Sequence, residues 1–76
     1  MRKKYVKVYM EIDENGNKTP KKIIYNDQEF DIDRVLDVRN APSMKVGGVG
    51  ERYRISIRGK ETYIYFENNK WFVEEK

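Results

Sequence analysis

The sequence predicts an all-β fold, a small barrel or strongly bent antiparallel sheet of about six strands. The first indication is the choice of aliphatic residues, because the chain has seven Val and seven Ile but one Leu and one Ala. β-Branched side chains lose rotamer freedom in helices and fit a pleated sheet. The second is a period-two alternation of apolar and polar residues, and the third is Asn and Gly placed where short hairpins turn.

Residues 4–12 and 19–25 are the first two predicted strands. In the first, Val6 and Val8 share one face, and polar or tyrosine side chains occupy the other. Asn15-Gly16 turns the chain between them, because both residue types tolerate the positive φ that tight hairpins need. Pro20 stands at the start of the second strand, where no ladder donor is required.

A bend or bulge is predicted near Asp33-Arg34, within the third stretch at residues 28–40. The apolar residues on both sides of Arg34 share its parity, so a charge interrupts an otherwise apolar face. A strand that changes direction at this point removes the conflict, and small barrels need such bends to close. The general kind of barrel predicted is therefore SH3-like.

Two hairpins are predicted in the C-terminal third, from strands at residues 51–58, 61–67 and 70–75. Gly59-Lys60 suits a two-residue II′ turn, and Asn68-Asn69 suits the I′ type. Two-residue loops set the register, since residue numbers across each turn then sum to a constant. The predicted core face has one row of Tyr53, Phe66 and Trp71 and a second row of Ile55, Ile64 and Val73.

The same register predicts a second face that carries arginines and aromatic rings. It pairs Arg58 with Glu61 and Arg52 with Glu67. Two interpretations stay open: the remaining sheet wraps over these side chains, or the face is an exposed contact surface. The candidate binding residues are Arg52, Arg54, Arg58, Tyr63, Tyr65 and Phe72, with Lys45 from the preceding loop.

A glycine-rich connecting loop is predicted at residues 40–50. Phosphate loops of the Walker or dinucleotide type lead into a helix. Here Gly50 is followed by Glu51 and a predicted strand, which favours a flexible connection. Lys45 lies within the loop and arginines flank it, so anion binding stays open.

Charge is segregated along the chain. Residues 25–38 hold five acidic residues and one basic residue, whereas residues 39–60 hold six basic residues and one acidic residue. Such blocks attract each other within a fold, or the basic block faces a polyanion. The net charge of +3 is modest for a nucleic-acid-binding domain.

Missing residue types exclude several function classes. The chain has no Cys and no His, which excludes disulfides, thiol nucleophiles, Ser-His triads and zinc sites built from thiolate or imidazole. An EF-hand loop counted from Asp31 would need Gly and Glu where Leu36 and Pro42 stand. Charges interrupt every apolar run near the N-terminus. We expect one domain over residues 1–76 of a cytoplasmic protein, with no enzyme activity, cofactor, metal or membrane insertion.

Residues 19–75 resemble a group of short bacterial all-β proteins that share a domain of unknown function. The resemblance rests on the segment IDRVLDVRNAPS, the loop GGVGERY, the hairpin around RGK and the closing WFVE. It implies the all-β fold and a bacterial source. It implies no activity, ligand or site residue.

The sequence favours a binding module. The first hypothesis is a nucleic-acid or polyanion binder that uses the arginines, Lys45 and the rings of the second face. The alternative is a protein-interaction module that uses the aromatic face or an open strand edge. We expect a monomer or weak dimer in either case.

Overall fold

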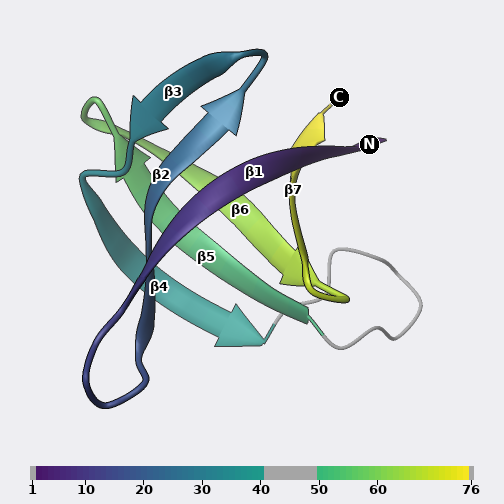
Figure 1. Ribbon diagram of the computed structural model, residues 1–76. Helices are drawn as coiled ribbons and strands as arrows, with labels where there is room; N and C mark the ends of the chain where they lie inside the picture. Colours follow the sequence, from purple (N-terminus) through teal and green to yellow (C-terminus); the bar gives the residue numbers. More distant parts are fainter. Residues whose placement is uncertain (1, 41–49, 76) are drawn as a thin grey trace.

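The computed structural model describes residues 2–40 and 50–75, and these residues form seven strands and no helix. The strands are β1 (Arg2–Ile12), β2 (Lys18–Tyr25), β3 (Gln28–Asp31), β4 (Arg34–Asn40), β5 (Gly50–Ile57), β6 (Lys60–Glu67) and β7 (Lys70–Glu75). They form one sheet in the order β3-β2-β1-β7-β6-β5-β4, with antiparallel neighbours. The sheet curls into a half-barrel (Figure 1), which confirms the predicted all-β, barrel-like fold.

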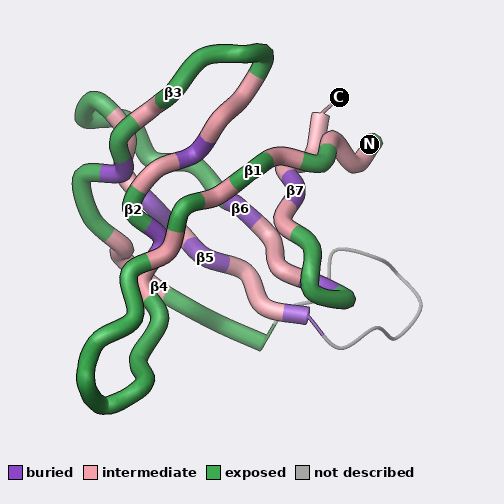
Figure 2. The backbone as a smooth tube through the Cα atoms, in the orientation of Figure 1, coloured by how far each residue is buried: buried purple, intermediate pink, exposed green. Residues whose placement is uncertain are grey.

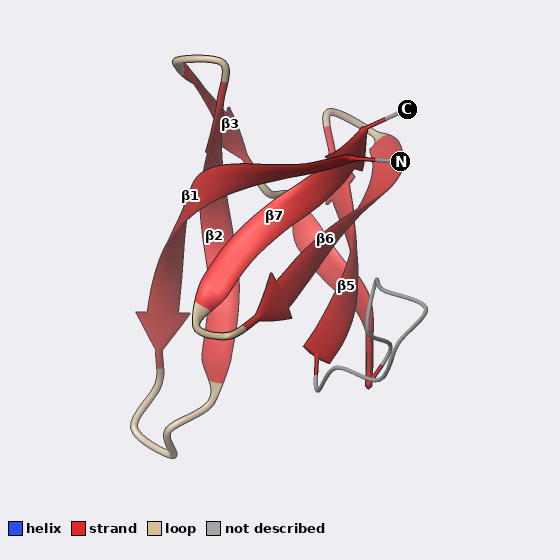
Figure 3. Ribbon diagram, turned by 90° about the vertical axis from the view of Figure 1, so that its right-hand side faces the viewer, coloured by secondary structure: helices blue, strands red, loops and turns tan. Residues whose placement is uncertain are grey.

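β1 connects the two halves of the sheet. Residues 2–6 pair with β7, whereas residues 7–12 pair with β2. The ladder with β2 shifts register between Tyr9 and Met10, and Pro20 lies opposite Met10 at that irregularity. A bulge tolerates proline because the ladder does not need its missing N–H there. Figure 3 shows β1 running beside β7 before it diverges towards β2.

The predicted bend in residues 28–40 is confirmed. β3 and β4 are separated by Ile32 and Asp33. The Ile32 N–H donates to the Lys21 carbonyl at 2.9 Å, and the Asp33 N–H donates to the Ser56 carbonyl at 2.7 Å. The corner therefore carries the chain from the edge of β2 to the edge of β5, and it divides the third predicted stretch into two strands.

The hydrophobic core lies on the inner face of the half-barrel, and Figure 2 shows buried positions on β2, β5 and β6. The Trp71 ring lies 5.0 Å from the Tyr53 ring and 4.8 Å from the Phe66 ring, measured between centroids. These contacts confirm the predicted core face. The buried cluster consists of Ile23, Ile32, Tyr53, Ile55 and Ile64.

The predicted register between β5 and β6 is wrong by two residues. Arg58 and Gly59 have φ angles of 52° and 79°, so the turn is Arg58-Gly59, with the two positive φ values of type I′, and not Gly59-Lys60. Tyr53 consequently pairs with Ile64. A shift of two residues leaves every side chain on its predicted face, because the side-chain period is also two.

The other hairpins differ in how far they match the prediction. Asn68 and Asn69 have φ angles of 53° and 62°, which confirms the type I′ turn between β6 and β7. Between β1 and β2, Gly16 has a φ of 83°, and its N–H donates to the Asp13 carbonyl at 3.0 Å. Asn15 has no positive φ. The loop is therefore the three-residue type, a turn followed by a left-handed glycine, and not a tight two-residue turn.

Most of the predicted glycine-rich loop, residues 41–49 with Lys45, lies outside the described residues. Residues 2–40 and 50–75 contain no helix long and apolar enough to cross a membrane.

Candidate functional site

The outer face of the half-barrel carries a cross-strand row of side chains from five neighbouring strands. Neighbouring strands lie about 4.8 Å apart, so the row extends roughly 19 Å across the sheet. Each member pairs in register with the next, and we term the set the outer row. Its members are Tyr5 (β1), Phe72 (β7), Tyr65 (β6), Arg52 (β5) and Arg39 (β4).

The three rings of the outer row pack on one another. Tyr65 stacks on Phe72 with centroids 5.4 Å apart and an interplanar angle of 10°, and Tyr5 meets Phe72 edge-on at 5.8 Å. Lys3 Nζ lies 4.7 Å from the centroid of the Phe72 ring. Phe72 is 0% exposed, whereas Tyr5 is 57% exposed. Phe72 therefore anchors the cluster, and the accessible ring surface belongs to its neighbours.

The structure brings Arg52, Arg54, Tyr63 and Tyr65 together on the outer face, as the sequence predicts. The Arg52 guanidinium lies 4.7 Å from the centroid of the Tyr63 ring, and Tyr63 is 42% exposed. Arg54 donates to Glu61 at 2.8 Å. β1 lies beside β7 in the same sheet, so it extends this face sideways.

Arg58 does not belong to the outer face. It lies in the β5–β6 turn, and its guanidinium is 5.1 Å from the centroid of the Phe30 ring of β3. The predicted pairs of Arg58 with Glu61 and of Arg52 with Glu67 are wrong, because the register is shifted by two residues. Glu61 instead accepts from Arg54.

Sequence reasoning missed what β1 contributes to the outer face. Lys70 Nζ lies 5.5 Å from the Tyr5 ring centroid, and Lys7 Nζ lies 5.3 Å from the Tyr9 ring centroid. The alternation in residues 4–12 already places these tyrosines and Lys7 on one face. The pairing of β1 with β7 was absent from the prediction, because no short turn connects the two strands.

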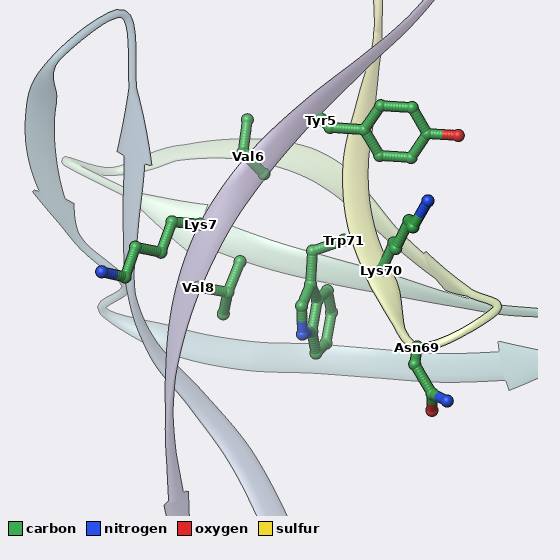
Figure 4. Close-up of a pocket in the computed structure, with 7 residues that line it drawn as sticks. All are labelled: Tyr5, Val6, Lys7, Val8, Asn69, Lys70 and Trp71. Atoms are coloured by element: carbon green, nitrogen blue, oxygen red, sulfur yellow. The ribbon is translucent and has the colours of Figure 1, made fainter.

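A shallow hollow of about 600 Å³ lies where β1 diverges from β7, and we term it the β1–β7 hollow. The last pair between these strands joins Val6 to Trp71. In Figure 4 the Val8 side chain faces the Trp71 ring, and Lys70 extends beside Tyr5. The hollow thus combines an indole on its inner side with tyrosine and lysine at its rim.

The cations of the outer face fall into two groups. Arg39 and Arg54 are neutralised by carboxylates. Arg39 Nε lies 2.7 Å from Asp37 and lowers the pKa of that carboxyl, and Arg54 is paired with Glu61. Across residues 2–40 and 50–75, no carboxylate lies within ion-pair distance of Lys7, Arg52 or Lys70. This second group is held over tyrosine rings and keeps its charge available to an external anion.

The described part of the chain holds no cluster of acidic side chains that could bind a metal ion. Burial, followed by the hydrogen bond with Glu74, raises the pKa of Tyr65, so its phenol is neutral at physiological pH. Comparisons with protein-family models, with curated proteins and with solved structures find no match. The geometry of the outer face therefore carries the functional argument.

Proposed function

We propose that this protein is a non-enzymatic binding module that holds single-stranded nucleic acid on its outer face. The observation that supports the proposal is the pairing of exposed tyrosine rings with cations that have no carboxylate partner in the described residues. Tyr5 has Lys70 over its ring, and Tyr63 has Arg52. An exposed ring stacks on any base, and a cation beside it neutralises the adjoining phosphate.

A single strand fits this surface better than a duplex. The bases of a duplex are already stacked inside the helix, whereas an unpaired base can lie on a protein ring. The β1–β7 hollow offers an opening beside Tyr5 and Lys70 into which one base can insert. We expect little sequence preference, because the surface recognises rings and phosphates, and micromolar or weaker affinity.

The proposal predicts different effects for substitutions at different arginines. Arg52 lies over a ring, whereas Arg54 is paired with Glu61. Arg52→Gln should therefore weaken binding more than Arg54→Gln does. Arg58→Gln removes the same charge from a turn away from the outer face and serves as the matched control.

The test is fluorescence anisotropy with a labelled oligothymidylate at low salt. Tyr63→Ala should lose about 1–3 kcal/mol of binding free energy if a base stacks on that ring. Arg58→Gln should stay within about twofold of the wild-type affinity, because it removes a charge that does not contact the bound oligonucleotide. Binding that is insensitive to Tyr63→Ala and Arg52→Gln, or that depends on Arg58, would contradict the proposal.

A protein-interaction module is the second candidate, and the edge strand β4 favours it. Within the described residues, β4 forms a ladder with β5 alone, and Val38 on β4 is 45% exposed. An open edge can accept a strand from a partner. Val38→Lys should abolish such strand addition and leave oligonucleotide binding intact, so this variant separates the two candidates.

A further inference from the structure

We propose that the open end of the half-barrel binds an amphipathic organic anion, an alkyl or aryl carboxylate, in a cleft separate from the outer face. This end cleft lies between the β2–β3 hairpin, the β5–β6 hairpin and the end of β7, and its volume is about 440 Å³. That volume falls in the range of about 300–1,000 Å³ usual for small-ligand sites. Its lining is mainly apolar and includes Ile23, Tyr25, Phe30, Ile57, Ile64 and Val73.

The end cleft exists because the barrel does not close. β3 and β4 are the two edges of the sheet, and the chain joins them only through the corner at Ile32 and Asp33. Beyond this corner the two hairpins diverge, so Phe30 and Ile57 are left partly buried. Apolar surface in such a cleft gains free energy when a ligand displaces its water.

The charges at the cleft select the sign of the ligand. Arg58 and Lys60 line it, and in residues 2–40 and 50–75 no carboxylate lies within ion-pair distance of either. The nearby Asp33 carboxylate accepts from the Gly59 N–H at 3.2 Å, and Glu75 on the opposite wall accepts from the Tyr25 hydroxyl. Glu74 also lines the cleft, and it hydrogen-bonds with Tyr65. These carboxylates are thus engaged within the protein, whereas Arg58 and Lys60 form no ion pair among the described residues.

The backbone at Arg58 supports a role for its side chain. Its φ of 52° is left-handed, and in a type I′ turn Asn or Gly would adopt this conformation with less strain. Arg58 instead lays its guanidinium over Phe30, one wall of the cleft. A guanidinium in this position can bind a carboxylate through two hydrogen bonds while the ligand's apolar part contacts the ring.

The experiment is an NMR titration of the ¹⁵N-labelled protein with hexanoate, octanoate and decanoate. Saturable shifts should appear at Phe30, Ile57, Thr62 and Val73. Affinity should rise by up to about fourfold for each added methylene until the cleft is full. Octylammonium, with the same chain length and the opposite charge, should bind more weakly than octanoate.

Variants separate this site from the nucleic-acid surface. Arg58→Gln and Lys60→Gln should each lower octanoate affinity by about twofold to fivefold, as expected for an exposed ion pair. Lys70→Gln, on the outer face, should leave octanoate binding unchanged. The absence of saturable binding, equal binding of octanoate and octylammonium, or shifts confined to the outer face would overturn the proposal. None of these results bears on oligonucleotide binding, which depends on Arg52 and Tyr63.

Discussion

Gly50 is the residue that lets Glu67 lie buried against the sheet. A Cβ atom at position 50 would lie 2.4 Å from Glu67 Cγ, too close for any side chain to remain in place. Glu67 is 7% exposed and forms an ion pair with Lys3 at 3.3 Å. A buried carboxylate is stable only with such partners, so the glycine and the ion pair depend on each other.

Gly50→Ala should therefore destabilise the protein by about 1–3 kcal/mol, the usual cost of forcing extra atoms into a packed site. Urea unfolding of Gly50→Ala, Glu67→Ala and the double variant measures the coupling. Because Glu67→Ala removes the obstructing side chain, Gly50→Ala should cost less in that background. Strictly additive effects would show that the two side chains do not compete for this space.

Asp13 organises the β1–β2 loop through its carboxylate. Oδ1 accepts the N–H groups of Asn15 at 2.8 Å and Asn17 at 2.9 Å. The Asn17 backbone hydrogen bond is the main cause that lowers the pKa of Asp13 below its ordinary value of 3.8. A group whose pKa falls on folding stabilises the folded state above its unfolded pKa, and this contribution disappears as pH falls through the folded value.

Asp13→Asn keeps the shape of the side chain and one acceptor oxygen while it removes the charge. The difference in melting temperature between wild type and Asp13→Asn should be largest near neutral pH and should shrink as pH falls below about 4. Thermal unfolding monitored by circular dichroism across this range is the measurement. A difference that stays constant down to pH 2 would rule out a charge-dependent contribution.

The β5–β6 hairpin shows what can be read from local sequence at the scale of an element. Glycine at 59 predicts a turn, but both Arg58-Gly59 and Gly59-Lys60 satisfy the two-residue rule. The choice is settled by contacts distant in sequence, including the Gly59 N–H to Asp33 and the Arg58 guanidinium over Phe30. Local patterns therefore predicted the faces of the strands, and the register needed tertiary structure.

Cysteine pairs can test the register, because the chain has no cysteine of its own. Ser56 and Glu61 are directly opposite in the observed register. Ser56→Cys/Glu61→Cys should form a disulfide under mild oxidation, since directly opposite residues have suitable spacing. Ser56→Cys/Tyr63→Cys, which matches the register predicted from sequence, should stay reduced because diagonal neighbours lie about 7–8 Å apart. The reverse result would restore a turn at Gly59-Lys60.

The part of the outer face that lies on β5 and β6 could be predicted from the local sequence pattern. The rings and arginines of β5 and β6 share a face because of simple alternation, which needs no tertiary information. Tyr5 and Lys7 join them only because β1 pairs with β7, so that Arg2 lies opposite Glu75. Pairing between the two ends of a chain has no local sequence signal, since no turn specifies it.

For the whole molecule, the curl of the sheet produces two different surfaces. The outer face presents cations over tyrosine rings, and the open end presents an apolar cleft with Arg58 and Lys60. Figure 1 shows the start of β1 beside the end of β7. The cations differ between the two surfaces, since Arg58 and Lys60 line the end cleft and Arg52 and Lys70 lie over rings of the outer face. The two surfaces can therefore be altered independently by substitution.

The salt dependence of oligothymidylate binding tests the central claim most directly. If about three or four phosphates are neutralised by outer-face cations such as Lys7, Arg52 and Lys70, the logarithm of affinity should fall with the logarithm of salt with a slope of about −2 to −3. Between about 50 and 200 mM salt, affinity should drop on the order of twentyfold to fiftyfold, and Arg52→Gln should make the slope shallower by about 0.7. An affinity that does not change over this range, or a slope that Arg52→Gln leaves unaltered, would contradict nucleic-acid binding by the outer face.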